Sequence, residues 1–251
     1  MIHSFLLIGQ SNAAGRGLLT DAEPLDACNG KLLVLRNGRW VEMYRPVNPD
    51  RVFSGTCLAE SFAKAYSEAY SDVNVGIIPC ADGGTSLAQW QPGEVLFDNA
   101  VNCAKLAMRT SHLVGVLWHQ GESDCSEELY PLYRQNFQNI TEALRKELNI
   151  PNLPFLLGGL GDFLAECTMS EDMKNYHYIN NTLQKIANDD PDCAFVSAEG
   201  LGANPDNLHF NSKALKEFGV RYFNQFQKIF GDRNGIVSEK NHIPLTAMEM
   251  I

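Results

Sequence analysis

Short apolar segments alternate with longer amphipathic segments along most of this chain. The apolar runs predict strands, and the amphipathic stretches between them predict helices of more than about ten residues. This alternation predicts parallel β-α-β units, and therefore a three-layer α/β/α sandwich around a mostly parallel five-stranded sheet. The five predicted strands are His3–Ile8, Val73–Pro79, Leu113–Trp118, Phe155–Leu157 and Ala194–Ser197.

An Asn37-Gly38 turn between two strand-like runs predicts a small hairpin inserted beside this sheet. Three of the predicted helices are Glu127–Leu148, Met173–Ala187 and Ser212–Phe230. With 251 residues, 45% of them hydrophobic, the chain can bury one sizeable core. No linker or repeat divides the sequence, so we expect one domain over residues 1–230, followed by a C-terminal tail, 231–251.

Charge and cysteine usage narrow the classes of partner. The net charge of -10 argues against binding to nucleic acid or to an anionic membrane surface. Seven cysteines without a CxxC pair indicate neither a disulfide framework nor a zinc site. The first apolar run lacks a preceding basic region and is too short for a signal peptide or a membrane span. We therefore expect a cytoplasmic protein with a small-molecule or oligosaccharide substrate.

Four polar clusters follow predicted strands or precede the last predicted helix. Because parallel strands present their carboxyl ends at one edge of a sheet, we expect these clusters to converge there. They are Gly9-Gln10-Ser11-Asn12, Gly83-Gly84-Thr85-Ser86, His119-Gln120-Gly121-Glu122 and Asp206-Asn207-Leu208-His209.

The clusters contain the groups needed for acyl transfer. A serine hydroxyl needs an imidazole to accept its proton and a carboxylate to orient that imidazole. Ser11, His209 and Asp206 supply these three groups, with the last two separated by only three positions. The backbone N–H of Ser11, an N–H of the Gly83-Gly84 turn and the side-chain amide of Gln120 are candidate donors to an oxyanion.

In this order the four clusters resemble the sequence motifs of the SGNH hydrolases. They are most similar to the branch that contains the sialate O-acetylesterase domain and the acetylxylan esterases of carbohydrate esterase family six. The matching stretches are residues 9–15, 83–90, 118–123 and 206–209, so the resemblance spans roughly residues 5–210. Gln10 and Gln120 stand where the general SGNH pattern has Asp and Asn, which favours this esterase branch over lipase-like relatives.

The resemblance implies a flavodoxin-like sandwich and a metal-free serine esterase that removes acetyl groups from sugars without a cofactor. The implied catalytic residues are Ser11, Asp206 and His209, and the implied oxyanion donors are Ser11, Gly84 and Gln120. Two alternatives stay open: hydrolysis of another short acyl ester or thioester, and a catalytically silent glycan-binding module. Five further residues are candidates for site support or substrate contact: Gln10, Asn12, Gly83, Glu122 and Trp90.

Overall fold

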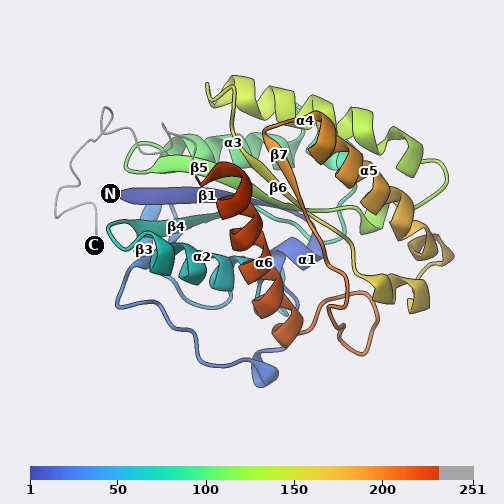
Figure 1. The fold of residues 1–251 in the computed structure, drawn as a ribbon, viewed down its shortest axis with the longest axis horizontal. Coiled ribbons are helices and arrows are strands. Elements are labelled where there is room, and N and C mark those ends of the chain that lie inside the picture. Colours follow the sequence, from blue (N-terminus) through green and yellow to red (C-terminus); the bar gives the residue numbers. More distant parts are fainter. Residues whose placement is uncertain (232–251) are drawn as a thin grey trace.

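A seven-stranded sheet forms the middle layer of the computed structural model, which describes residues 1–231 (Figure 1). The strand order across the sheet is β3-β2-β4-β1-β5-β6-β7. The strands are β1 (Ile2–Gly9), β2 (Leu32–Arg36), β3 (Arg39–Glu42), β4 (Asn74–Pro79), β5 (His112–His119), β6 (Phe155–Gly158) and β7 (Cys193–Val196). All neighbouring pairs are parallel except β2 and β3. The predicted α/β class and mostly parallel sheet are confirmed.

The predicted strand count of five was too low, because the hairpin is part of the sheet. β2 pairs in parallel with β4, with Leu32 opposite Val75 and Val34 opposite Ile77. Both Leu32 and Val34 are fully buried against one face of the sheet. Pairing with the free edge of β4 satisfies the backbone groups of β2 while burying these side chains, which an isolated hairpin does not achieve.

Helices cover both faces of the sheet (Figure 1). Successive residues of β1 alternate between two cores: Phe5 and Leu7 pack on one face, and Leu6 and Ile8 pack on the other. Helices α2 (Leu58–Ala69) and α6 (Ser212–Phe230) cover the first face, and α3 (Val95–Ala107), α4 (Tyr133–Glu147) and α5 (Tyr176–Asp189) cover the second. Strand β1 is therefore buried on both sides, as its apolar sequence predicts.

Short helical turns fill several connections between these elements. The four-residue helix α1 (Ser11–Ala14) follows β1 directly. The 3₁₀ helices are η1 (Leu19–Asp21), η2 (Leu87–Trp90), η3 (Glu122–Asp124), η4 (Tyr130–Leu132), η5 (Asp162–Glu166) and η6 (Glu171–Asn175). Two of them take up the beginnings of predicted helices. The helix predicted from Glu127 begins only at Tyr133, after η4 with its Pro131, and the helix predicted from Met173 begins at Tyr176, after η6.

The four polar clusters lie at one edge of the sheet. Three of them follow the carboxyl ends of β1, β4 and β5, which are neighbours in the sheet, and the fourth precedes α6. Within residues 1–231 no helix is long and apolar enough to cross a membrane. The predicted tail, 231–251, lies outside the described residues apart from Gly231.

Candidate active site

Ser11, His209 and Asp206 form a continuous chain of contacts at this edge of the sheet. The Oγ atom of Ser11, the first residue of α1, lies 3.1 Å from Nε2 of His209. The Nδ1 atom of the same imidazole lies 2.7 Å from Oδ2 of Asp206. Nearly two hundred residues separate Ser11 from the other two, and the fold brings them to hydrogen-bonding distance.

Gly9 allows Ser11 to reach this position. Its backbone has a φ angle of +130°, which side chains other than hydrogen rarely tolerate. A Cβ atom at Gly9 would collide with the carbonyl oxygen of His119, and that same oxygen accepts a hydrogen bond of 3.0 Å from the N–H of Gln10. The close approach of β1 and β5 at this point turns the chain sharply into α1, with Ser11 at its start.

Hydrogen bonds keep the carboxyl of Asp206 in its charged form. Partial burial raises the pKa of Asp206. The hydrogen bond with His209 and those from the backbone N–H groups of Leu208 and His209 together lower this pKa by more than burial raises it. The net pKa lies below the ordinary value for an aspartate. Asp206 is therefore an anion at neutral pH, and it is oriented toward the imidazole by its own loop.

The side chain of Asn12 forms hydrogen bonds with the backbone on both sides of His209. Its Oδ1 accepts a hydrogen bond of 3.0 Å from the N–H of Phe210, and its Nδ2 donates one of 3.1 Å to the carbonyl of Leu208. The same Nδ2 donates to Oε1 of Glu122 at 2.6 Å. Because Leu208 and Phe210 flank His209, the buried amide of Asn12 fixes the backbone on each side of the imidazole.

Glu122 is a buried carboxylate behind Asn12. Its Oε1 also lies 3.4 Å from Nε2 of His119, which is fully buried. Burial raises the pKa of Glu122, but the contacts with His119 and Asn12 outweigh this effect, and its pKa lies below the ordinary value. Glu122 thus supports the serine loop and the histidine loop from beneath, and lies 2% exposed to solvent.

The two glycines of the second cluster have different surroundings. The N–H of Gly83 donates to Oδ2 of Asp50 at 2.9 Å, and Asp50 is itself held by a buried, two-pronged ion pair with Arg16. Gly84 is exposed and has a φ angle of +77°. No hydrogen bond uses the N–H of Gly84 within residues 1–231. Gly84 therefore has a donor available at the site, whereas the N–H of Gly83 is occupied.

The side-chain amide nitrogen of Gln120, a candidate oxyanion donor, already contacts three other residues of the protein. Nε2 lies in hydrogen-bonding range of Asp124 Oδ2, of the Thr85 carbonyl at 3.2 Å and of Gln10 Oε1 at 3.3 Å. An amide nitrogen has two protons, so the two longer contacts share one of them. A direct contact between Gln120 and an oxyanion requires these two contacts to give way. Gln10 also accepts from the N–H of Ser123 at 3.2 Å and so ties the first cluster to the third.

Trp90 lies too deep to touch a substrate. Its side chain is 1% exposed, packs against Trp118 and donates from Nε1 to Oγ1 of Thr85 at 3.0 Å. Of the two roles considered for Trp90, site support and substrate contact, this burial rules out the second. The indole fills the core beneath the loop that contains Gly83 and Gly84. Its contact with Thr85 leaves Trp90 as a support for that loop.

Three residues in these contacts were not singled out from the sequence. Asp124 lies in the same stretch as Gln120 and Glu122, and its position in that stretch was the available signal. Arg16 and Asp50 lie in segments without a motif, and only the folded chain shows that they meet. Within residues 1–231 no group of three or more His, Cys, Asp or Glu side chains is arranged to hold a metal ion.

Replacing Asp124 with asparagine is expected to change how stability depends on pH. Burial raises the pKa of Asp124 from 3.8 to about 6, against the hydrogen bonds from Gln120 and from the N–H of Leu87. The folded protein then holds more protons than the unfolded chain between these values, so the free energy of unfolding falls as pH rises through this window. The shift corresponds to about 3 kcal/mol.

Denaturant unfolding at pH 4 and pH 7 tests this expectation. Asp124→Asn lacks the titrating group, so its stability relative to the wild type should rise by up to about 3 kcal/mol between the two pH values. Glu199→Gln removes an exposed carboxyl and serves as the control. A difference between Asp124→Asn and wild type that does not change with pH would show that this carboxyl is not perturbed.

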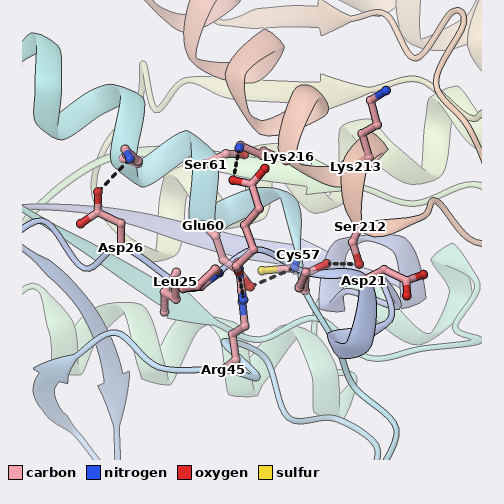
Figure 2. A pocket seen from close by; sticks show the side chains of 15 residues that line it. Asp21, Leu25, Asp26, Arg45, Cys57, Glu60, Ser61, Ser212, Lys213 and Lys216 are labelled. Atoms are coloured by element: carbon pink, nitrogen blue, oxygen red, sulfur yellow. Dashed lines mark hydrogen bonds and ion pairs between the residues drawn. The ribbon is translucent and has the colours of Figure 1, made fainter.

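A separate pocket of about 310 Å³ lies between the segment after η1 and the helices α2 and α6 (Figure 2). Six of its charged side chains form ion pairs, Arg45 with Glu60, Lys64 with Asp26, and Lys216 with Glu23, and Asp21 and Lys213 also line it. Ser11, Asp206 and His209 are not among its lining residues. The candidate active site is therefore distinct from this pocket.

Comparison with known proteins shows the family of this chain. The family described as "Carbohydrate esterase, sialic acid-specific acetylesterase" matches residues 1–228. The chain belongs to this family. A probable carbohydrate esterase from Arabidopsis thaliana is 28% identical to this esterase over 243 residues, which cover 86% of each chain. The predicted family is thus confirmed, and the protein is a carboxylic ester hydrolase of the carbohydrate acetylesterase class.

Solved structures share the fold of this esterase. An Arabidopsis thaliana protein has a TM-score of 0.78 at 26% identity, over 91% of this chain and 98% of the other. NanS has a TM-score of 0.71 at 17% identity, over 92% and 98% of the two chains. A carbohydrate acetylesterase from Xanthomonas citri has a TM-score of 0.63 at 19% identity, over 90% of this chain and 56% of the other. The last two likenesses concern the fold alone.

Proposed function

We propose that this esterase removes O-acetyl groups from carbohydrates through a covalent acetyl-enzyme on Ser11. The observation that carries the proposal is the chain of contacts from Ser11 Oγ to His209 Nε2, at 3.1 Å, and from His209 Nδ1 to Asp206 Oδ2, at 2.7 Å. A hydroxyl, an imidazole and an ionised carboxylate in this order form a nucleophile, a general base and an orienting group.

The reaction proceeds in two steps of acyl transfer. His209 Nε2 takes the proton of Ser11 Oγ as this oxygen attacks the acetyl carbonyl, and the protonated imidazole then gives that proton to the departing sugar oxygen. The carbon–oxygen bond to the sugar breaks, and the acetyl group stays on Ser11. A water molecule, deprotonated by the same imidazole, attacks the carbonyl of the acetyl-enzyme. The bond between the acetyl carbon and Ser11 Oγ breaks, the imidazolium returns its proton to Oγ, and acetate leaves. Asp206 stabilises the imidazolium that forms in each step.

We assign the oxyanion to the backbone N–H groups of Ser11 and Gly84. Ser11 is the first residue of α1, where a backbone N–H has no partner within the helix, and the N–H of Gly84 is not used by the described part of the chain. Preorganised donors of this kind stabilise the tetrahedral intermediate. Gln120 is proposed as a third donor, in which case one of its protons leaves Thr85 and Gln10 during the reaction.

The remaining candidate residues have supporting roles in this proposal. Asn12 and Glu122 position the His209 loop, and Gln10 joins the serine loop to the third cluster. Asp50 accepts from Gly83 and so orients the neighbouring N–H of Gly84. These contacts support a site whose groups are held in place before the substrate arrives, which reduces the reorganisation needed during the reaction.

Family and relatives support an acetylated carbohydrate as the substrate. The matching family is described as a sialic acid-specific acetylesterase, and the Arabidopsis thaliana relative as a probable carbohydrate esterase. We further propose that residues 1–230 are a single catalytic domain. All seven cysteines are free thiols, which favours a reducing compartment such as the cytoplasm. The acidic chain argues against nucleic acid as a partner.

Acetate release from a panel of esters tests the proposed function. We expect turnover of O-acetylated mono- and oligosaccharides, and activity on p-nitrophenyl esters that falls from acetyl to octanoyl. A preference for octanoyl esters or for thioesters would instead support hydrolysis of another acyl group. Binding of acetylated glycans without release of acetate would support a silent binding module and contradict the proposal.

A further inference from the structure

A short loop at the rim of the site presents an exposed aromatic side chain. Residues 50–54 connect Asp50, which binds Gly83, to Ser54, whose Oγ donates to Asp50 Oδ1 at 2.8 Å. Between these two anchors, Phe53 is 67% exposed. Its neighbour Val52 is fully exposed, so the two side chains present adjoining apolar surface at this rim.

Arg16 fixes the place of Phe53 relative to Ser11. The guanidinium carbon of Arg16 lies 5.2 Å from the centre of the Phe53 ring, so one face of the ring covers the cation. A Cβ atom at Gly83 would touch both this guanidinium and, at 3.4 Å, the Cβ atom of Ser11. Gly83 therefore separates the arginine from the nucleophile by a single backbone layer, and the loop that carries Phe53 contacts the same glycine through Asp50 and Arg51.

The anchors of the loop are strong enough to hold the ring in place. Asp50 makes two hydrogen bonds with the Arg16 guanidinium, of 2.6 and 3.0 Å, and the side chains of both residues are nearly fully buried. Two-pronged arginine–carboxylate pairs fix orientation as well as distance. The aromatic ring thus rests on an immobilised cation, and a ligand that contacts it does not have to order a mobile side chain.

The charges beside the site disfavour an anionic sugar. Two arginines are placed there by contacts in the described part of the chain, and both are neutralised: Arg16 by Asp50, and Arg51 by Asp82 at 2.6 Å. Asp82 and Asp206 are partly exposed, and the whole chain carries a net charge of -10. A sugar carboxylate approaching Ser11 would meet repulsion from Asp206 and from the acidic chain as a whole, and both of these arginines already have carboxylate partners.

We propose that Phe53 is the platform on which the apolar face of a neutral acetylated sugar ring stacks while its ester reaches Ser11. This inference rests on the proposed esterase function and adds the substrate class. The C–H groups on one face of a pyranose form an apolar surface that suits an aromatic ring, whereas its hydroxyl groups point outward to solvent. A small acetyl ester without a sugar ring does not use this contact.

The first test compares a neutral sugar ester with a small aliphatic ester. For Phe53→Ala we expect kcat/KM on an O-acetylated methyl xylopyranoside to fall about tenfold, mainly through KM, with ethyl acetate hydrolysis unchanged within twofold. Phe53→Tyr keeps an aromatic ring and should retain activity on the sugar. Val52→Ala, a change at the fully exposed neighbour, is the matched control and should leave both substrates unaffected.

The second test compares neutral with anionic sugars. Wild-type enzyme should prefer the acetylated xyloside to the methyl glycoside of an O-acetylated sialic acid by at least about tenfold, with the preference narrowing as salt screens the repulsion. Asp82→Asn removes the nearer of the two carboxylates that contact Arg51, leaving Asp50 at 3.9 Å, and should shift the ratio toward the anionic ester.

Two results would overturn the inference. One is an equal effect of Phe53→Ala on ethyl acetate and on the xyloside, and the other is a wild-type preference for the anionic ester. Either result leaves the esterase proposal standing if wild-type enzyme still hydrolyses ethyl acetate through Ser11. Failure of the esterase proposal is seen separately, as wild-type enzyme that releases acetate from none of these substrates.

Discussion

Replacing Ser11 with alanine is expected to lower kcat/KM for p-nitrophenyl acetate by about 10⁴- to 10⁶-fold. The hydroxyl that lies 3.1 Å from His209 Nε2 is lost, and neither His209 nor a water molecule held in its place forms the acetyl-enzyme. The side chain of Ser11 packs at the start of a four-residue helix, and removing one oxygen there should change the thermal midpoint by only a few degrees. Esterase assays and thermal unfolding of the same preparation measure both effects.

Ser123→Ala provides the matched control for this variant. Ser123 directly follows the third polar cluster, and its backbone N–H rather than its hydroxyl contacts Gln10. We expect this variant to keep activity within about threefold, in line with surface substitutions that remove no essential contact. Equal activity of Ser11→Ala and wild type would exclude Ser11 as the nucleophile.

Replacing Asn12 with alanine is expected to lower kcat by about 10²-fold with a much smaller change in KM. The variant loses the hydrogen bonds to Leu208 and Phe210 that hold the backbone on each side of His209. A displacement of a catalytic group by about 1 Å costs on the order of 10²-fold in rate. Steady-state kinetics with acetylated sugars separates this effect on kcat from an effect on substrate binding.

Two further variants distinguish positioning from general destabilisation. Asn180 brackets Leu160 with hydrogen bonds of 2.7 and 3.0 Å, in the way that Asn12 brackets His209, but it does not contact the catalytic trio. Asn180→Ala should lose comparable stability and retain its kcat. Glu122→Gln keeps an oxygen that accepts from Asn12, so it should retain most of the activity. An equal loss of kcat in Asn12→Ala and Asn180→Ala would show that Asn12 affects catalysis only through the stability of the fold.

Hydrophobic periodicity was sufficient to predict the layers of this fold. Strand β1 is apolar at almost every position because both of its faces are covered, and α6 is apolar along one face because the other meets solvent. The convergence of the polar clusters followed from the parallel arrangement alone. The Ser11, His209 and Asp206 contacts are what such convergence predicts, although their catalytic roles stay a proposal.

Features that depend on pairing between distant segments could not be read from the sequence. The short run that became β2 has the same local pattern as an isolated hairpin, and only the free edge of β4 decides its place. Arg16 and Asp50 meet across more than thirty positions, in segments that no motif marks. Trp90 is apolar and near a glycine turn, which is equally typical of a sugar contact and of a buried support.

Covalent labelling of the enzyme with a fluorophosphonate, followed by peptide mass spectrometry, tests whether Ser11 is a nucleophile activated by His209. An activated serine reacts with this reagent, whereas a serine in a binding module does not. We expect one adduct on Ser11, with a labelling rate that falls at least about 10²-fold in His209→Ala, because the base is absent. Absence of an adduct would exclude Ser11 as the nucleophile, and labelling that is equally fast without His209 would exclude His209 as its base.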